Sequence, residues 1–184
     1  MNTYPSLQSS RLEMSRPLAS DIPAIIKYAG HPQIAQFTSN IPHPYLEQHA
    51  IGWINAANEG WKSQKSYVFA IRLRPTGAFI GGIGLHLHKA YQQAEMGYWM
   101  AFPFWNKGYT SEAVGRILSF GFETLELHKI FATHMINNPA SGKVLEKNGM
   151  IHEATMLDHL KKDEQYISLK QYRMLRREYE AMKG

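Results

Sequence analysis

One stretch constrains the fold more than any other: residues 104–113 (FWNKGYTSEA), followed by an amphipathic run that ends at Leu125. From Val114 on, apolar residues recur at the spacing of one helical face, which predicts a helix packed against a core. Gly108 stands where the chain has to turn before this helix, and the first N–H groups of a helix lack intrahelical acceptors. Such amides attract phosphate. An ordinary strand-to-helix turn is the alternative, and the local sequence taken alone favours it.

Length and composition indicate one ordinary globular domain. With 184 residues, 44% of them hydrophobic and 19% charged, we expect a single domain over residues 1–184, with residues 1–10 as a loose leader. No apolar run reaches the length of a membrane span and no signal peptide is recognisable, so we expect a cytoplasmic protein. The absence of cysteine excludes thiolate metal sites and a cysteine nucleophile. The net charge of +5 suits an anionic ligand, whereas nucleic acid is only a minor alternative.

The periodicities along the chain predict a mixed α+β fold. Segments with a period of two read as strands, and segments with a period of 3.6 read as helices. A helix between the third strand of a meander and the next strand implies a parallel crossover. The predicted strands are 11–17, 67–73, 79–88, 94–101, 129–136, 150–156 and 166–174. The predicted helices are 22–29, 46–62, the run that ends at 125, 138–148 and 176–182.

The order of these elements, with residues 105–113 at its middle, resembles the GNAT acyltransferases that use acetyl-coenzyme A. Within that family it is most similar to the Rim-type branch, the ribosomal-protein N-terminal acetyltransferases. Residues 94–99 and 138–150 support the resemblance, which spans roughly residues 10–175. It implies a central mixed, mostly antiparallel sheet of about seven strands, flanked by helices on both faces.

The resemblance also implies acetyl-coenzyme A as co-substrate and identifies its contacts. In the family, the turn before the central helix cradles the pyrophosphate. Pantetheine contacts are expected where the strand before that turn splays from its neighbour, with routine sheet pairing as the alternative. Asn138 and Ser141 match coenzyme-contacting positions, although both could simply cap a helix. The implied contacts are the backbone amides of Lys107, Gly108, Tyr109, Thr110 and Ser111 for the pyrophosphate, and Met100, Ala101 and Phe102 for pantetheine.

Transfer to a primary amine by direct attack in a ternary complex requires a base and an acid. Glu95 is the predicted base, acting through water, because the family commonly carries its base on this strand. A solvated carboxylate or a salt-bridge partner is the alternative. The tyrosine that many relatives use as acid is replaced by Leu145, so Ser141 is the candidate acid. His134 is a second candidate base, although a histidine there is more often a core residue.

The acceptor is expected to be a protein N-terminal α-amine or a small-molecule amine. Phe37, Tyr45, His86 and Trp99 are the predicted acceptor-binding residues. The first two come from the segment 33–45, a loop or broken helix that we expect to select the substrate. His86 and His88 share a strand face, but no third ligand is evident, so no metal is predicted.

Three points stay open at the level of sequence. The missing tyrosine at Leu145 keeps a non-catalytic acyl-coenzyme A-binding module as an alternative. Thr110 could bond to phosphate or cap the helix. A homodimer through the final strands or helices is compatible with the sequence.

Overall fold

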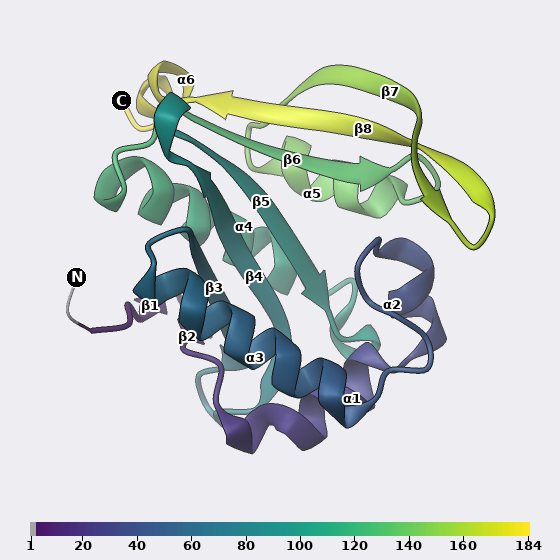
Figure 1. Cartoon of the computed structure of the whole chain (residues 1–184). Coiled ribbons are helices and arrows are strands. Elements are labelled where there is room, and N and C mark those ends of the chain that lie inside the picture. The colour runs from purple at the N-terminus through teal and green to yellow at the C-terminus, as the bar shows by residue number, and fades with distance from the viewer. Residues whose placement is uncertain (1–2) are drawn as a thin grey trace.

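A computed structural model describes residues 3–184. Its strands form one eight-stranded sheet (Figure 1). The strands lie side by side in the order β1-β2-β3-β4-β5-β6-β8-β7. Every neighbouring pair is antiparallel except β5 and β6, which are parallel, as the predicted crossover requires. The strands are β1 Leu7–Gln8, β2 Leu12–Ser15, β3 Ser66–Leu73, β4 Phe79–His88, β5 Gln93–Met100, β6 Lys129–Met135, β7 Ile151–Lys162 and β8 Gln165–Leu175.

Helices cover both faces of the sheet, which confirms the predicted fold class (Figure 1). Ile71 of β3 packs in the larger core with Ile117, which lies in the central helix. The preceding residue, Ala70, packs in a second cluster with Ile25 and Ile54. Because successive strand side chains point to opposite faces, α4 covers one face and α1 and α3 cover the other. The helices are α1 Ile22–Ala29, α2 Pro32–Phe37, α3 Glu47–Lys62, α4 Tyr109–Ser119, α5 Pro139–Lys147 and α6 Arg176–Ala181.

The prediction of a loose leader is wrong for the residues that the structure describes. Leu7 and Gln8 form β1, which is the eighth strand where about seven were expected. Leu7 is buried, and the Tyr4 hydroxyl donates to the carbonyl of Val68. These partners lie far along the chain, so the local pattern of Pro and Ser residues gave no sign of them. Residues 1 and 2 of the predicted leader lie outside the described part of the chain.

The C-terminal hairpin is longer than predicted. The predicted strands 150–156 and 166–174 extend to Lys162 and back from Gln165, with an irregular register between Met156 and Leu160. At the tip, the Lys162 ammonium donates to the carbonyls of Ala35 and Thr38, the latter at 2.7 Å. The hairpin therefore closes over the C-terminal end of α2.

Two helical segments also differ in detail from the expectation. The central helix ends at Ser119 and continues as one π-helical turn, Phe120–Thr124, instead of running as α-helix to Leu125. The segment 33–45 is a broken helix, with α2 followed by a loop. Across residues 3–184, no helix combines the length and apolar character needed to cross a membrane.

Candidate active site

A deep pocket opens where β5 and β6 separate. The two strands pair only at Gln93, Ala94 and Glu95 of β5, and beyond Glu95 they diverge (Figure 1). Residues 96–100 of β5 and 133–135 of β6 then line a pocket of about 1360 Å³. The structure therefore has the splay that was expected, and the alternative of routine pairing on this side of β5 does not apply.

The N-terminus of α4 presents uncapped amides at this pocket. Gly108 is the N-cap, with φ at +77°, a conformation that favours glycine, and it supplies no side-chain cap. The first helical bond runs from Glu112 N–H to the Gly108 carbonyl at 3.1 Å. Within residues 3–184, the amides from Gly108 to Ser111 have no hydrogen-bond acceptor. Thr110 is not the N-cap and lines the pocket, so capping does not account for it.

Hydrogen bonds between Glu112 and the N-terminal segment, called the staple below, stabilise this turn. The Glu112 carboxylate accepts from Ser9 Oγ at 2.7 Å, and from the backbone and Nε of Arg11 at 2.8 and 2.6 Å. Arg11 also donates to the Lys107 carbonyl at 3.0 Å. Burial raises the pKa of Glu112, but the hydrogen bonds from Ser9, Arg11 and Ser10 outweigh it and lower the pKa to about 2. The contact between Arg11 and Glu112 was not predicted from the sequence, because about a hundred residues separate the two.

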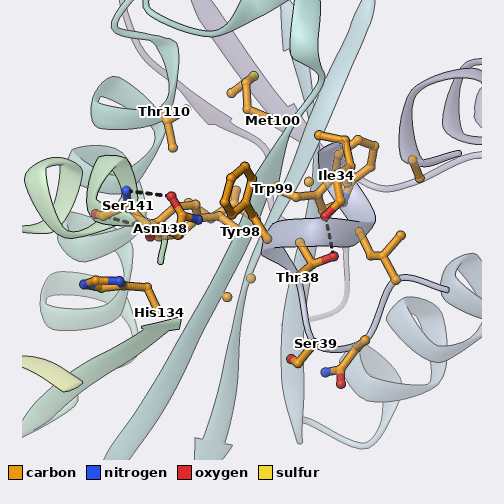
Figure 2. Close-up of a pocket in the computed structure, with 18 of the residues that line it drawn as sticks. Ile34, Thr38, Ser39, Tyr98, Trp99, Met100, Thr110, His134, Asn138 and Ser141 are labelled. Carbon is orange, nitrogen blue, oxygen red and sulfur yellow. Dashed lines mark hydrogen bonds between the residues drawn. The ribbon is translucent and has the colours of Figure 1, made fainter. Parts of the chain in front are cut away.

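Tyr98 and Ser141 meet across the pocket. Asn138 caps α5 by accepting from Ser141 N–H at 3.3 Å, so capping uses the serine backbone and leaves its hydroxyl available. That hydroxyl lies 2.7 Å from the Tyr98 hydroxyl (Figure 2). Burial raises the pKa of Tyr98 to about 12, against the lowering effect of the Ser141 bond. Tyr98 was not predicted as a site residue, since strand alternation assigns it to the core face with Met96.

Glu95 lies on the opposite face of β5, where the acceptor was expected. It faces His86 across the β4–β5 pair and lines the pocket together with Trp99. Phe37 and Tyr45 reach the same pocket from the segment after α1. In the described part of the chain, Glu95 forms neither an ion pair nor a hydrogen bond, so the salt-bridge alternative does not describe it. The carboxylate is half-buried and free to meet a ligand.

Four predicted coenzyme contacts lie outside the pocket lining. The Ala101 amide donates to the Ile80 carbonyl at 2.8 Å and is therefore committed to the sheet. Phe102 is exposed and stacks on His31. Lys107 and Tyr109 direct their side chains to Phe104 and to the Arg11 guanidinium, respectively. The structure thus does not support Ala101 or Phe102 as pantetheine contacts, whereas Lys107 and Tyr109 were predicted through their amides.

Strand alternation shows which amides of β5 face the opening. Because Ala101 N–H points toward β4, the N–H groups of Tyr98 and Met100 point toward the separated β6. The Met100 carbonyl accepts from Trp105 Nε1 at 2.5 Å, which ties the end of β5 to the turn before α4. The same indole that marks the sequence motif therefore fixes the rim of the pocket.

His134 has the features of a packing residue. It is 7% exposed, its Nδ1 lies 2.8 Å from the Met135 carbonyl, and its ring stacks on Tyr172. Burial lowers its pKa, which keeps it neutral. Figure 2 shows the ring pointing away from Tyr98 and Trp99. Across residues 3–184, no three His, Asp or Glu side chains gather closely enough to hold a metal ion.

Comparisons with a family model, with known sequences and with solved structures all find acetyltransferases. Residues 11–151 match the family model described as "Acetyltransferase (GNAT) domain". "Uncharacterized N-acetyltransferase YnaD" of Bacillus subtilis is 30% identical over 161 residues, covering 86% of this chain and 90% of that protein. "Putative ribosomal N-acetyltransferase YdaF" of the same organism is 33% identical over 108 residues, 58% of this chain and 59% of that protein. The solved structure of RimL, a ribosomal L7/L12 α-N-protein acetyltransferase in complex with coenzyme A, superposes with a TM-score of 0.85 at 14% identity, covering 93% and 98% of the two chains.

Proposed function

This chain belongs to the GNAT acetyltransferase family, and from that premise we propose that it moves the acetyl group of acetyl-coenzyme A to a primary amine by direct attack in a ternary complex. The observation that carries the proposal is the pocket at the β5–β6 splay. Free amides of α4 open into it, and Glu95 reaches it from the other face of β5. The acceptor is a protein N-terminal α-amine or a small-molecule amine.

The coenzyme site rests on the backbone of two elements. The amides from Gly108 to Ser111 suit a pyrophosphate, because they are unpaired and aligned with the dipole of an eleven-residue helix. The N–H groups of Tyr98 and Met100 suit pantetheine and the thioester carbonyl. The coenzyme A in the RimL complex supports a coenzyme as the ligand of this site. Asn138 contributes through its amide nitrogen, since its oxygen already caps α5.

The reaction then follows from the residues around the splay. The amine nitrogen forms a bond to the thioester carbon while the carbon–sulfur bond breaks. Glu95 removes the excess amine proton through a water molecule, and Ser141 delivers a proton to the departing thiolate. Tyr98 orients the serine hydroxyl through their hydrogen bond. The proton that Glu95 takes from the amine is released to solvent, and solvent water restores the proton that Ser141 has given to the thiolate. The products are an N-acetylated amine and free coenzyme A.

Substitution of Glu95 tests the proposal. We expect Glu95→Gln to lower kcat by about a hundredfold in a thiol-release assay with a panel of amines, since a positioned general base typically contributes at least that much. The affinity for acetyl-coenzyme A, measured by calorimetry, should not change. Glu164→Gln serves as a matched control, because that carboxylate is 89% exposed at the hairpin tip.

Two outcomes would contradict the proposal. Full activity of Glu95→Gln would remove Glu95 from the mechanism. Tight binding of acetyl-coenzyme A without turnover of any amine would favour the acyl-coenzyme A-binding module that Leu145, buried in α5, keeps as the alternative.

A further inference from the structure

The pocket is almost uncharged. The protein has 20 lysine and arginine residues, yet none of those in residues 3–184 lines the pocket. Of the aspartate and glutamate residues in the same part of the chain, only Glu95 does so. Lys162 comes near at the hairpin tip, but its ammonium is occupied by the carbonyls of Ala35 and Thr38. His49, His86 and His134 also line the pocket, so a ligand there meets one acidic side chain, three imidazoles and no lysine or arginine.

Around Glu95, where the acceptor is proposed to bind, the walls of the pocket are aromatic and aliphatic. Phe37 and Tyr45 come from the segment after α1, Trp53 comes from α3, and Trp99 comes from β5. Phe79 links the two indoles, with its ring 6.5 Å from that of Trp53 and 5.8 Å from that of Trp99. This second core cluster gives the pocket an apolar side.

Gly97 leaves open space beside Glu95, the carboxylate that lines the pocket. It is exposed and lies between Glu95 and Trp99, which are half-buried on the same face of β5, and all three residues line the pocket. A Cβ atom at Gly97 would have no neighbour within 4 Å. An acceptor can therefore lie flat across Gly97 with its nitrogen at Glu95.

A second charge on the acceptor would find no partner in this space. A carboxylate next to the amine would meet no lysine or arginine, and a second ammonium would meet no further carboxylate. Leaving such a group desolvated and unpaired is costly. We infer, on the basis of the function proposed above, that the acceptor is a monoamine on an uncharged aromatic or aliphatic body that lies across Gly97. Small amines and neutral peptide N-termini share this chemistry.

A series of acceptors tests, with the wild-type protein, whether a second charge on the acceptor lowers its use as a substrate. The amines are phenethylamine, phenylalaninamide, an amidated Phe-Gly-Gly peptide, phenylalanine and spermidine, with each kcat/KM normalised to the fraction of neutral amine. We expect phenylalanine and spermidine to be at least about tenfold poorer than phenethylamine, which corresponds to about 1.4 kcal/mol. The peptide and phenethylamine arms separate the two sources of such an amine. Equal or better use of phenylalanine or spermidine would overturn the inference.

A substitution at Gly97 tests the location. Gly97→Val should fold normally, because the added carbons enter open space and valine suits a strand. We expect its kcat/KM for phenethylamine to fall at least about tenfold, with Gly97→Ala between the two and with unchanged affinity for acetyl-coenzyme A. Unchanged kcat/KM in Gly97→Val would show that the acceptor lies elsewhere. Bound coenzyme with no turnover of any amine by the wild type would instead refute the proposed function itself.

Discussion

At the residue scale, the pair formed by Tyr98 and Ser141 is the sharpest test of the proposed chemistry. Tyr98→Phe keeps the ring and removes the hydroxyl that lies 2.7 Å from the Ser141 hydroxyl and 3.3 Å from the Ser141 carbonyl oxygen. We expect kcat to fall about two- to tenfold, with the KM for acetyl-coenzyme A unchanged, because a net hydrogen bond is worth about 1 kcal/mol. Ser141→Ala removes the proton donor and should cost about tenfold or more. Steady-state thiol release measures both effects.

The pH profile distinguishes orientation from titration. With its pKa raised to about 12, the Tyr98 phenol stays protonated between pH 6 and 9, so Tyr98→Phe should lower kcat evenly across that range. Tyr166→Phe is the matched control, since this tyrosine is 67% exposed on β8. Full kcat in both Tyr98→Phe and Ser141→Ala would place the acid on solvent instead.

The individual site residues differ in how far sequence could identify them. Glu95, Asn138 and Ser141 lie in motifs whose order along the chain is informative, and the structure brings all three to one pocket. Tyr98 escaped detection because alternation places it with the core side chains of β5. Its hydroxyl becomes a site group only because α5 begins directly opposite, which no local pattern reports.

At the scale of elements, Arg11 stabilises the turn before α4 through its contacts with Glu112 and the Lys107 carbonyl. Glu112 puts a carboxylate in the first turn of α4, near the amides proposed for the pyrophosphate, and Arg11 neutralises it. Arg11→Met should leave that charge unpaired and release the Lys107 carbonyl. We expect the KM for acetyl-coenzyme A to rise about tenfold with little change in kcat, since repulsion acts on the phosphates.

A double variant separates repulsion from loss of the staple. Adding Glu112→Gln to Arg11→Met removes the unpaired charge, so part of the lost affinity should return. Arg177→Met is the control, because Arg177 is exposed on α6 and forms no ion pair in the described chain. A KM in Arg11→Met equal to that of Arg177→Met would show that the turn needs no such support.

The elements themselves were predictable where their signals are local. Asn138, Pro139 and Gly149 mark both ends of α5, and the structure places the helix between them. β1 was missed because two residues carry no period, and its pairing to β2 depends on tertiary contacts. The hairpin of β7 and β8 was predicted too short, because an irregular register breaks the alternation that would extend it.

At the scale of the whole molecule, acid stability should follow the carboxylates that the fold engages. The ordinary pKa of 4.5 for Glu112 falls to about 2 in the folded state, and the pKa values of Glu123, Glu153 and Glu178 are also lowered. A carboxyl with a depressed folded pKa binds protons more readily when unfolded. Its stabilisation is therefore complete above about pH 4.5 and is lost as pH falls toward about 2.

Glu112→Gln isolates one part of this dependence. At pH 7 the variant should be less stable by about 1–3 kcal/mol, the cost of weakening charge-assisted hydrogen bonds in a largely buried site. As pH falls from 4.5 to 3, the wild-type carboxyl loses its advantage, so the difference between the two thermal midpoints should shrink. Glu164→Gln, at an exposed carboxylate, should match the wild type throughout. Titration of His134 also changes stability with pH, but its effect cancels in this comparison because both proteins contain it. A difference in midpoint as large at pH 3 as at pH 7 would mean that the staple acts through packing and not through the charge of Glu112.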